Sequence, residues 1–81
     1  WMALIEIVQL LNQIEEDISV PKNVRNKICS MRNMFEMDSL DMNIKIDKSL
    51  QELDEISDDP NIPSFIRTQI WSIVSLLESK K

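Results

Sequence analysis

The sequence predicts an all-α protein, a four-helix bundle made of two similar helical hairpins, and three observations support this class. The chain of 81 residues contains no glycine, whereas tight β-hairpin turns need residues with positive φ. Apolar residues recur at spacings of three and four along four segments, as on one face of a helix. The chain also repeats itself, because a shift of 42 residues pairs 1–39 with 43–81 without a gap. Such a period is typical of two-helix repeats.

The repeat is clearest where "SVPKNVRNKI" (19–28) aligns with "NIPSFIRTQI" (61–70). We therefore expect one domain, residues 1–81, with hairpin 1 at about 3–36 and hairpin 2 at about 40–78. Nine of the 39 aligned pairs are identical: Gln9/Gln51, Leu11/Leu53, Ile14/Ile56, Asp17/Asp59, Pro21/Pro63, Arg25/Arg67, Ile28/Ile70, Ser30/Ser72 and Glu36/Glu78.

The four apolar stripes give the expected helices, near 3–16, 20–36, 40–56 and 62–78. Each stripe marks the face that should turn toward a shared core. In chain order the stripes are Leu4, Val8, Leu11, Ile14 and Ile18; Val24, Ile28, Met31 and Phe35; Met42, Ile46, Leu50, Leu53 and Ile56; and Ile66, Ile70, Ile73 and Leu77.

The helix starts carry capping signals. Each second helix is expected to begin with an N-cap residue, followed two residues later by a proline whose missing N–H costs nothing in the first turn. These residues are Ser19 and Pro21 in the first copy, and Asn61 and Pro63 in the second. We expect either Asp38 or Ser39 to cap the third helix.

A different packing of the same helices is the main alternative to the bundle. The "VR" and "IR" dipeptides after a loop aspartate are reminiscent of HEAT repeats, and two HEAT-like hairpins would stack as an open solenoid. Two such repeats alone would leave their faces poorly covered. The closed bundle is therefore preferred.

The segments "DISVPKNVR" and "LDEISDDPNIPSFIRTQIWSIVSLLE" resemble the archaeal uncharacterised protein family 0147, and the resemblance runs over about residues 4–78. It implies a small four-helix bundle similar to the bromodomain-like variant of up-and-down bundles. It also implies an archaeal, cytoplasmic protein. The family carries no established activity, substrate or catalytic residue, so the resemblance implies no function.

Composition argues against an enzyme. Without histidine or tyrosine, the Ser–His–Asp and Cys–His arrangements are impossible, and without glycine there is no phosphate-cradling loop. The single cysteine, Cys29, excludes an internal disulfide and suits a reducing cytoplasm. No apolar stretch is long enough to span a membrane, and no signal peptide is recognised. We therefore expect a cytoplasmic, non-catalytic protein with no cofactor, no metal and no small-molecule substrate.

Charge is unevenly distributed in a chain whose net charge is −5. A basic strip follows one side of the second helix through Lys22, Arg25 and Arg32, and it could contact nucleic-acid phosphates. So few basic residues on an acidic chain make a weak binding surface for nucleic acid. We prefer charge matching within the protein, against the acidic third helix, which carries Asp47, Asp54, Glu55 and Asp58.

Arginine and aspartate occupy matching places in the two copies. Arg25 and Arg67 follow loops that contain Asp17 and Asp59, respectively. The structural interpretation is a clamp, in which each guanidinium binds the carboxylate or carbonyls of its own loop. The alternative is an exposed arginine pair that recognises a partner.

The two copies differ in how far their apolar surface extends. Trp71 lies about 150° around its helix from the centre of the apolar stripe, at about 100° per residue. Large apolar residues off the core face are candidates for binding a protein partner or a second copy, most simply in a dimer. A neighbouring helix could instead cover them. The candidate residues are Trp71, Val74, Phe65, Ile5 and Leu10.

The sequence thus favours a small protein-interaction module. The alternative function is an accessory factor that binds nucleic acid or a ribonucleoprotein through the basic strip.

Overall fold

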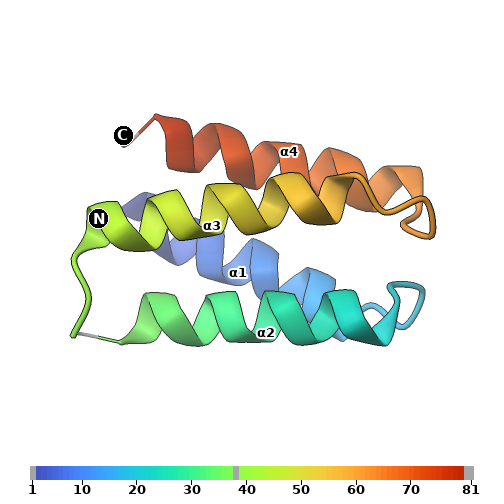
Figure 1. Cartoon of the computed structure of the whole chain (residues 1–81), viewed down its shortest axis with the longest axis horizontal. Helices are drawn as coiled ribbons and strands as arrows, with labels where there is room; N and C mark the ends of the chain where they lie inside the picture. Colours follow the sequence, from blue (N-terminus) through green and yellow to red (C-terminus); the bar gives the residue numbers. More distant parts are fainter. Residues whose placement is uncertain (1, 38, 80–81) are drawn as a thin grey trace.

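The computed structural model describes residues 2–37 and 39–79, and its secondary structure is entirely helical in this part of the chain. Four helices follow one another up and down (Figure 1). They are α1 (Met2–Glu16), α2 (Lys22–Glu36), α3 (Met42–Ser57) and α4 (Ser64–Glu78). The predicted all-α class is confirmed. The bounds of α4 equal those of α2 plus 42, whereas α3 begins two residues before and ends one residue before the bounds of α1 plus 42.

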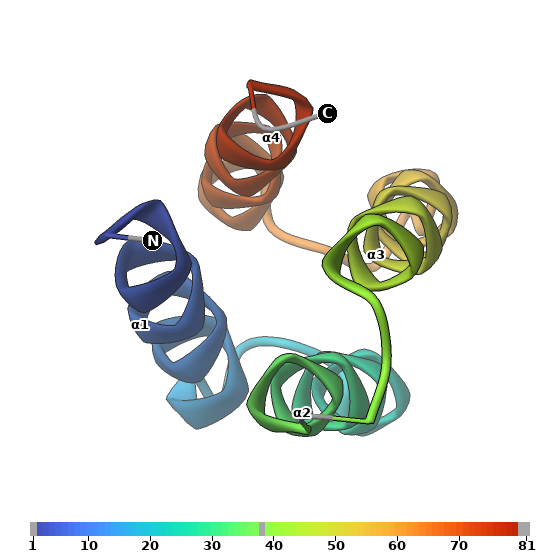
Figure 2. The same cartoon turned by 90° about the vertical axis from the view of Figure 1, so that its left-hand side faces the viewer.

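The helices form a closed ring (Figure 2). α1 packs against α2 and α4, and α3 packs against the same two helices. Stacked HEAT-like hairpins would place the equivalent helices α1 and α3 side by side, but in the described part of the chain these two helices make no close contact. The ring therefore agrees with the bundle and not with the solenoid.

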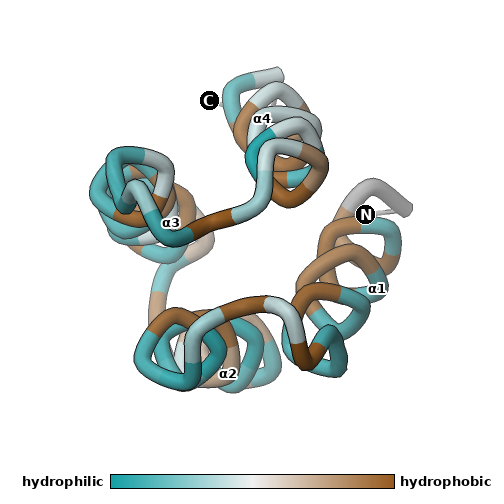
Figure 3. The backbone as a smooth tube through the Cα atoms, turned by 90° about the vertical axis from the view of Figure 1, so that its right-hand side faces the viewer, coloured by the Kyte–Doolittle hydropathy of each residue, from teal (hydrophilic) through white to brown (hydrophobic). Residues whose placement is uncertain are grey.

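The core lies along the axis of the ring, where the apolar faces of all four helices meet (Figure 3). The two second helices bury the stripes that the sequence predicts. They are Val24, Ile28, Met31 and Phe35 in α2, and Ile66, Ile70, Ile73 and Leu77 in α4.

The predicted stripe of the first helix is partly wrong. Ile7, Leu11 and Ile14 are fully buried, while Leu4 and Val8 are only partly buried. Ile18, expected in the core, is 89% exposed. Because α1 ends at Glu16, Ile18 lies in the loop and is no longer aligned with the helix face.

Each hairpin loop is organised by its aspartate. The carboxylate of Asp17 accepts hydrogen bonds from the backbone N–H of Ser19 at 2.9 Å and from its hydroxyl at 2.6 Å. The carboxylate of Asp59 accepts from the backbone N–H of Asn61, also at 2.9 Å. These are Asx-type turns, in which a side chain satisfies the backbone two residues later. The two loops of the repeat thus share their local geometry.

These turns correct the predicted helix starts. Ser19 and Asn61 are donors in the turns and do not cap helices. Pro21 and Pro63 have extended ψ angles of 145° and 147°, and they stand just before the first helical residue. α2 and α4 therefore begin two residues later than predicted.

The cap of α3 also differs from the prediction. The carboxylate of Asp41 accepts a 2.7 Å hydrogen bond from the backbone N–H of Asn43, so Asp41 is the N-cap. Ser39 lies two residues too early for this role. The other predicted cap, Asp38, lies outside the described residues.

Candidate binding surfaces

The exposed tryptophan borders a groove between α3 and α4. Trp71 is 61% exposed, and Val74, one turn further along α4, is half-buried. We call the hollow beside them the Trp71 groove; its volume is about 410 Å³. Its lining residues are Leu50, Gln51, Leu53, Asp54, Ser57, Trp71, Val74 and Glu78.

The other residues of the predicted patch lie elsewhere. Phe65 is 53% exposed, but it precedes Trp71 by six residues and so lies about 120° away around α4. Leu10 lines a separate groove between α1 and α4, and Ile5 is exposed about 140° around α1 from Leu10. The five predicted residues therefore do not form one surface, and only Trp71 and Val74 share the groove.

The polar lining of the Trp71 groove is acidic. Asp54 comes from α3 and Glu78 from the end of α4, and both are exposed. Gln51 and Ser57 are the other polar lining residues. A groove that holds an exposed indole and two carboxylates favours a cationic ligand, because the aromatic face and both carboxylates attract positive charge.

One residue of the basic strip, Arg32, is engaged within the protein. The Nε of Arg32 donates to Oε2 of Glu15 at 2.8 Å, linking α2 to α1, and its Nη1 lies 3.2 Å from Oε1 of Glu36. The hydrogen bond from Arg32 lowers the pKa of the Glu15 carboxyl, and the same bond raises the pKa of Arg32. Charge is thus matched between α2 and α1, whereas the sequence suggested α3. Of the strip, Lys22 is exposed and Arg25 half-buried.

The two predicted clamps differ in the structure. Arg67 donates from Nε to the carbonyl of Ser57 at 3.2 Å and from Nη2 to the carbonyl of Asp59 at 2.8 Å. Arg25 does not copy this arrangement: its Nε is buried and finds no hydrogen-bond partner among the described residues. Neither the Asp17 nor the Asp59 carboxylate accepts a hydrogen bond from an arginine. The hydrogen bond from the Ser19 hydroxyl and, to a smaller extent, the one from the Ser19 backbone N–H lower the pKa of the Asp17 carboxyl.

The described residues form no candidate metal site. In 2–37 and 39–79, no group of three acidic or thiol side chains could hold a metal ion. Cys29 is half-buried, with the Nη2 of Arg32 at 3.8 Å from its sulfur. None of the described helices is long and apolar enough to cross a membrane.

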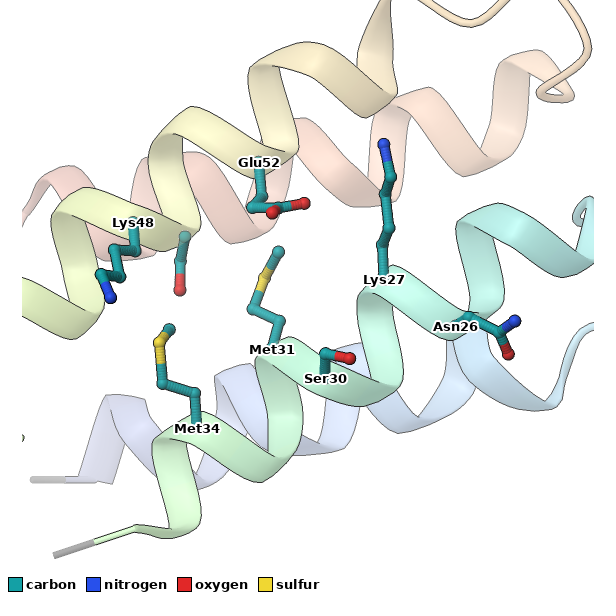
Figure 4. A pocket seen from close by; sticks show the side chains of 8 residues that line it. Asn26, Lys27, Ser30, Met31, Met34, Lys48 and Glu52 are labelled. Carbon is teal, nitrogen blue, oxygen red and sulfur yellow. The ribbon is translucent and has the colours of Figure 1, made fainter. Parts of the chain in front are cut away.

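A second groove lies between α2 and α3, and sequence reasoning missed it. We call it the α2–α3 groove; its volume is about 270 Å³ (Figure 4). In this view the side chains of Met31 and Met34 rise from α2 toward α3, while Lys48 and Glu52 come from α3. Its lining residues are Asn26, Lys27, Ser30, Met31, Met34, Lys48, Ser49 and Glu52.

Two polar residues of α3 are buried beside this groove. Ser49 is 0% exposed, and Lys45, one turn earlier, is also buried. The ammonium group of Lys45 donates to the carbonyl of Met37, just after the end of α2. Ser49 lies outside the apolar stripe that the sequence predicts for the third helix. However, the 42-residue alignment pairs it with Ile7, and this pairing was the signal that the position could be buried.

These features define a small antiparallel four-helix protein with grooves between neighbouring helices. The chain belongs to the uncharacterised protein family UPF0147, whose model matches residues 2–79, so the predicted resemblance is confirmed. It is 34% identical over 74 residues to the UPF0147 proteins of the archaea Thermoplasma acidophilum and Methanosarcina acetivorans. These alignments cover 91% of this chain and 84% and 76% of the respective relatives. The crystal structure of the unknown-function protein MMP1188 is 39% identical, with a TM-score of 0.89 over 98% of this chain and 90% of that one.

Proposed function

We propose that this protein is a non-catalytic interaction module whose Trp71 groove binds a basic segment of a partner protein. The observation that carries the proposal is the exposure of Trp71, at 61%, beside a groove with an acidic rim. Tryptophan is enriched in binding hot spots because it removes a large area from water at a small cost in conformational entropy.

The groove supplies both components of such an interface. Leu50 and Val74 are half-buried and give it an apolar lining next to the indole. Asp54 and Glu78 provide negative charge at its edge. A lysine or arginine of the partner would stack on Trp71, while its aliphatic stem covers the apolar lining. Because Glu78 lies seven residues, or about 10.5 Å, along α4 from Trp71, other basic residues of the segment would approach Asp54 and Glu78.

Self-association through this groove is less favourable. In a two-fold contact the same surface of both chains is used, so the acidic rim of one groove would face the acidic rim of the other. Like charges brought together at an interface weaken binding. A basic partner avoids this repulsion.

The proposal that the module is not an enzyme is supported by the residue types available. The sequence contains no histidine or tyrosine, and the described carboxylates and thiol do not cluster. Nucleic-acid binding through the basic strip is disfavoured, because Arg32 already binds two glutamates.

The proposal can be tested with two fluorescently labelled peptides of equal length, one alternating lysine with leucine and one alternating glutamate with leucine. We expect the basic peptide to bind the parent, and Trp71→Ala to weaken this binding by about tenfold, as for a modest hot spot. Fluorescence anisotropy gives the affinities, and circular dichroism checks folding.

Phe65→Ala is the matched control, because it removes an exposed aromatic from the same helix without changing the charge. It should bind the basic peptide like the parent. Equal losses in both variants, or none in either, would refute the proposal. A parent dimer that dissociates on Trp71→Ala in analytical ultracentrifugation would instead assign the surface to self-association.

A further inference from the structure

The α2–α3 groove has a counterpart in the same molecule. The groove between α1 and α4 is lined by Glu6, Leu10, Ser72, Ser75, Leu76 and Ser79. Adding or subtracting 42 relates four of its residues to lining residues of the α2–α3 groove. The pairs are Glu6/Lys48, Leu10/Glu52, Ser72/Ser30 and Leu76/Met34. Each groove therefore serves as a control for the other.

A buried position at the α2–α3 groove carries different residues in the two copies of the repeat. In the first copy Ile7 is fully buried in the core. In the second copy the position is held by Ser49, which is smaller and polar but equally buried. A serine within a helix can bond a carbonyl one turn back, but the Oγ of Ser49 has no hydrogen-bond partner among the described residues. Buried polar groups are nearly always paired, so this hydroxyl points to a missing partner.

The walls of the two grooves also differ in charge. Lys48 stands where the α1–α4 groove has Glu6, and Lys27 stands where α4 has Gln69. Glu52 is the carboxylate that lines the α2–α3 groove. Two lysines and one glutamate give its lining a charge of +1, whereas Glu6 alone gives its counterpart −1. Neither groove lysine forms an ion pair with any described residue.

Apolar surface completes the site. Met31 and Met34 turn their side chains from α2 toward α3 (Figure 4). Methionine adapts its shape to irregular apolar ligands. The groove volume of about 270 Å³ lies just under the range of drug-sized sites, about 300–1,000 Å³, so a small ligand fits best.

We propose that the α2–α3 groove binds a small aliphatic carboxylate. Its hydrocarbon chain lies along Met31 and Met34. Its carboxylate accepts a hydrogen bond from the Lys48 ammonium and, once the adaptable side chains of Met31 and Met34 shift, a second from the buried Ser49 hydroxyl. Lys27 adds positive charge to the groove lining. This site is separate from the Trp71 groove, because α3 presents its other side there.

Octanoate is a suitable probe, with 1-octanol and octylamine as neutral and cationic controls of equal chain length. Titrations followed by ¹H–¹⁵N correlation spectra of the full chain should show saturable shifts confined to α2 and α3. We expect octanoate to bind at least about tenfold more tightly than octanol, in line with a charge-assisted contact, and octylamine more weakly still.

Substitutions borrowed from the counterpart groove locate the site. Ser49→Ile and Lys48→Glu install the residues of the first copy, and each should weaken octanoate binding by about tenfold or more. Glu6→Gln, in the α1–α4 groove, should leave it unchanged. Circular dichroism checks folding, and Lys48→Glu, at an exposed position, keeps the test decisive if Ser49→Ile does not fold.

Three results would overturn the proposal. One is equal binding of octanoate and octanol, which would show general hydrophobic contact. The second is octanoate binding that survives both substitutions in folded protein. The third is no saturable binding of octanoate, which would mean that the groove does not hold an aliphatic carboxylate.

Discussion

Arg67 and Arg25 occupy the same place in the repeat, but removing their guanidinium groups should have unequal effects. Arg67 makes two charge-assisted hydrogen bonds, to the carbonyl of Ser57 at the end of α3 and to the carbonyl of Asp59 in the loop. Hydrogen bonds to charged groups contribute about 1.5–3 kcal/mol each, and this is reduced where water competes, as at the half-buried Arg67. We therefore expect Arg67→Met, which keeps most of the aliphatic stem, to lower the free energy of unfolding by about 1–3 kcal/mol.

Arg25→Met is the matched comparison. The buried Nε of Arg25 has no partner, so its removal also removes an unsatisfied donor, and the change should stay below about 1 kcal/mol in either direction. Urea denaturation at neutral pH measures both changes. In a domain of this size, each 1 kcal/mol corresponds to about 4–8 °C in Tm. Equal destabilisation by the two variants would show that the difference between the two loops has no energetic meaning.

Two further stability effects follow from the loops and caps. Asp41→Ala should cost about 1 kcal/mol, measured by the same urea denaturation, because the N-cap carboxylate of α3 is lost; Asp41→Asn, which still caps, should cost much less. The depressed pKa values of Glu15 and Asp17 mean that their folded carboxylates bind protons less readily than unfolded ones. Their contribution to stability is therefore present above the usual carboxyl pKa of about 4 and is lost as pH falls through the lowered values. Glu15→Gln combined with Asp17→Asn should flatten the acid side of a plot of Tm against pH, and an unchanged slope would contradict this.

The parts of the fold that could be predicted are those decided by local sequence. The stripe Val24, Ile28, Met31, Phe35 is buried as predicted, because four apolar residues at helical spacing leave one possible inward face. Ile18 fitted the same spacing but lies past the end of its helix, and Val20 is buried in its place. Helix ends depend on loop hydrogen bonds, here those of Asp17, which spacing alone does not reveal.

The candidate surfaces were harder to predict because they depend on which helices become neighbours. Sequence placed both Trp71 and Phe65 off the core stripe, but the angle alone did not show that Trp71 turns toward α3. That follows from the ring, in which α4 lies between α3 and α1. Ser49 was missed for a different reason, since polar residues are normally exposed and its burial is decided by the packing of α3 against its neighbours.

The closed ring also makes the order of the helices along the chain largely arbitrary. α1 begins and α4 ends at the same end of the bundle, and these two helices pack directly against each other although no loop joins them (Figures 1 and 2). A short linker between those ends, with the chain opened between α2 and α3, would yield a circular permutant in which every helix keeps both of its neighbours. Because the entropy of loop closure grows only slowly with loop length, such a rearrangement changes the connectivity of the bundle at little thermodynamic cost.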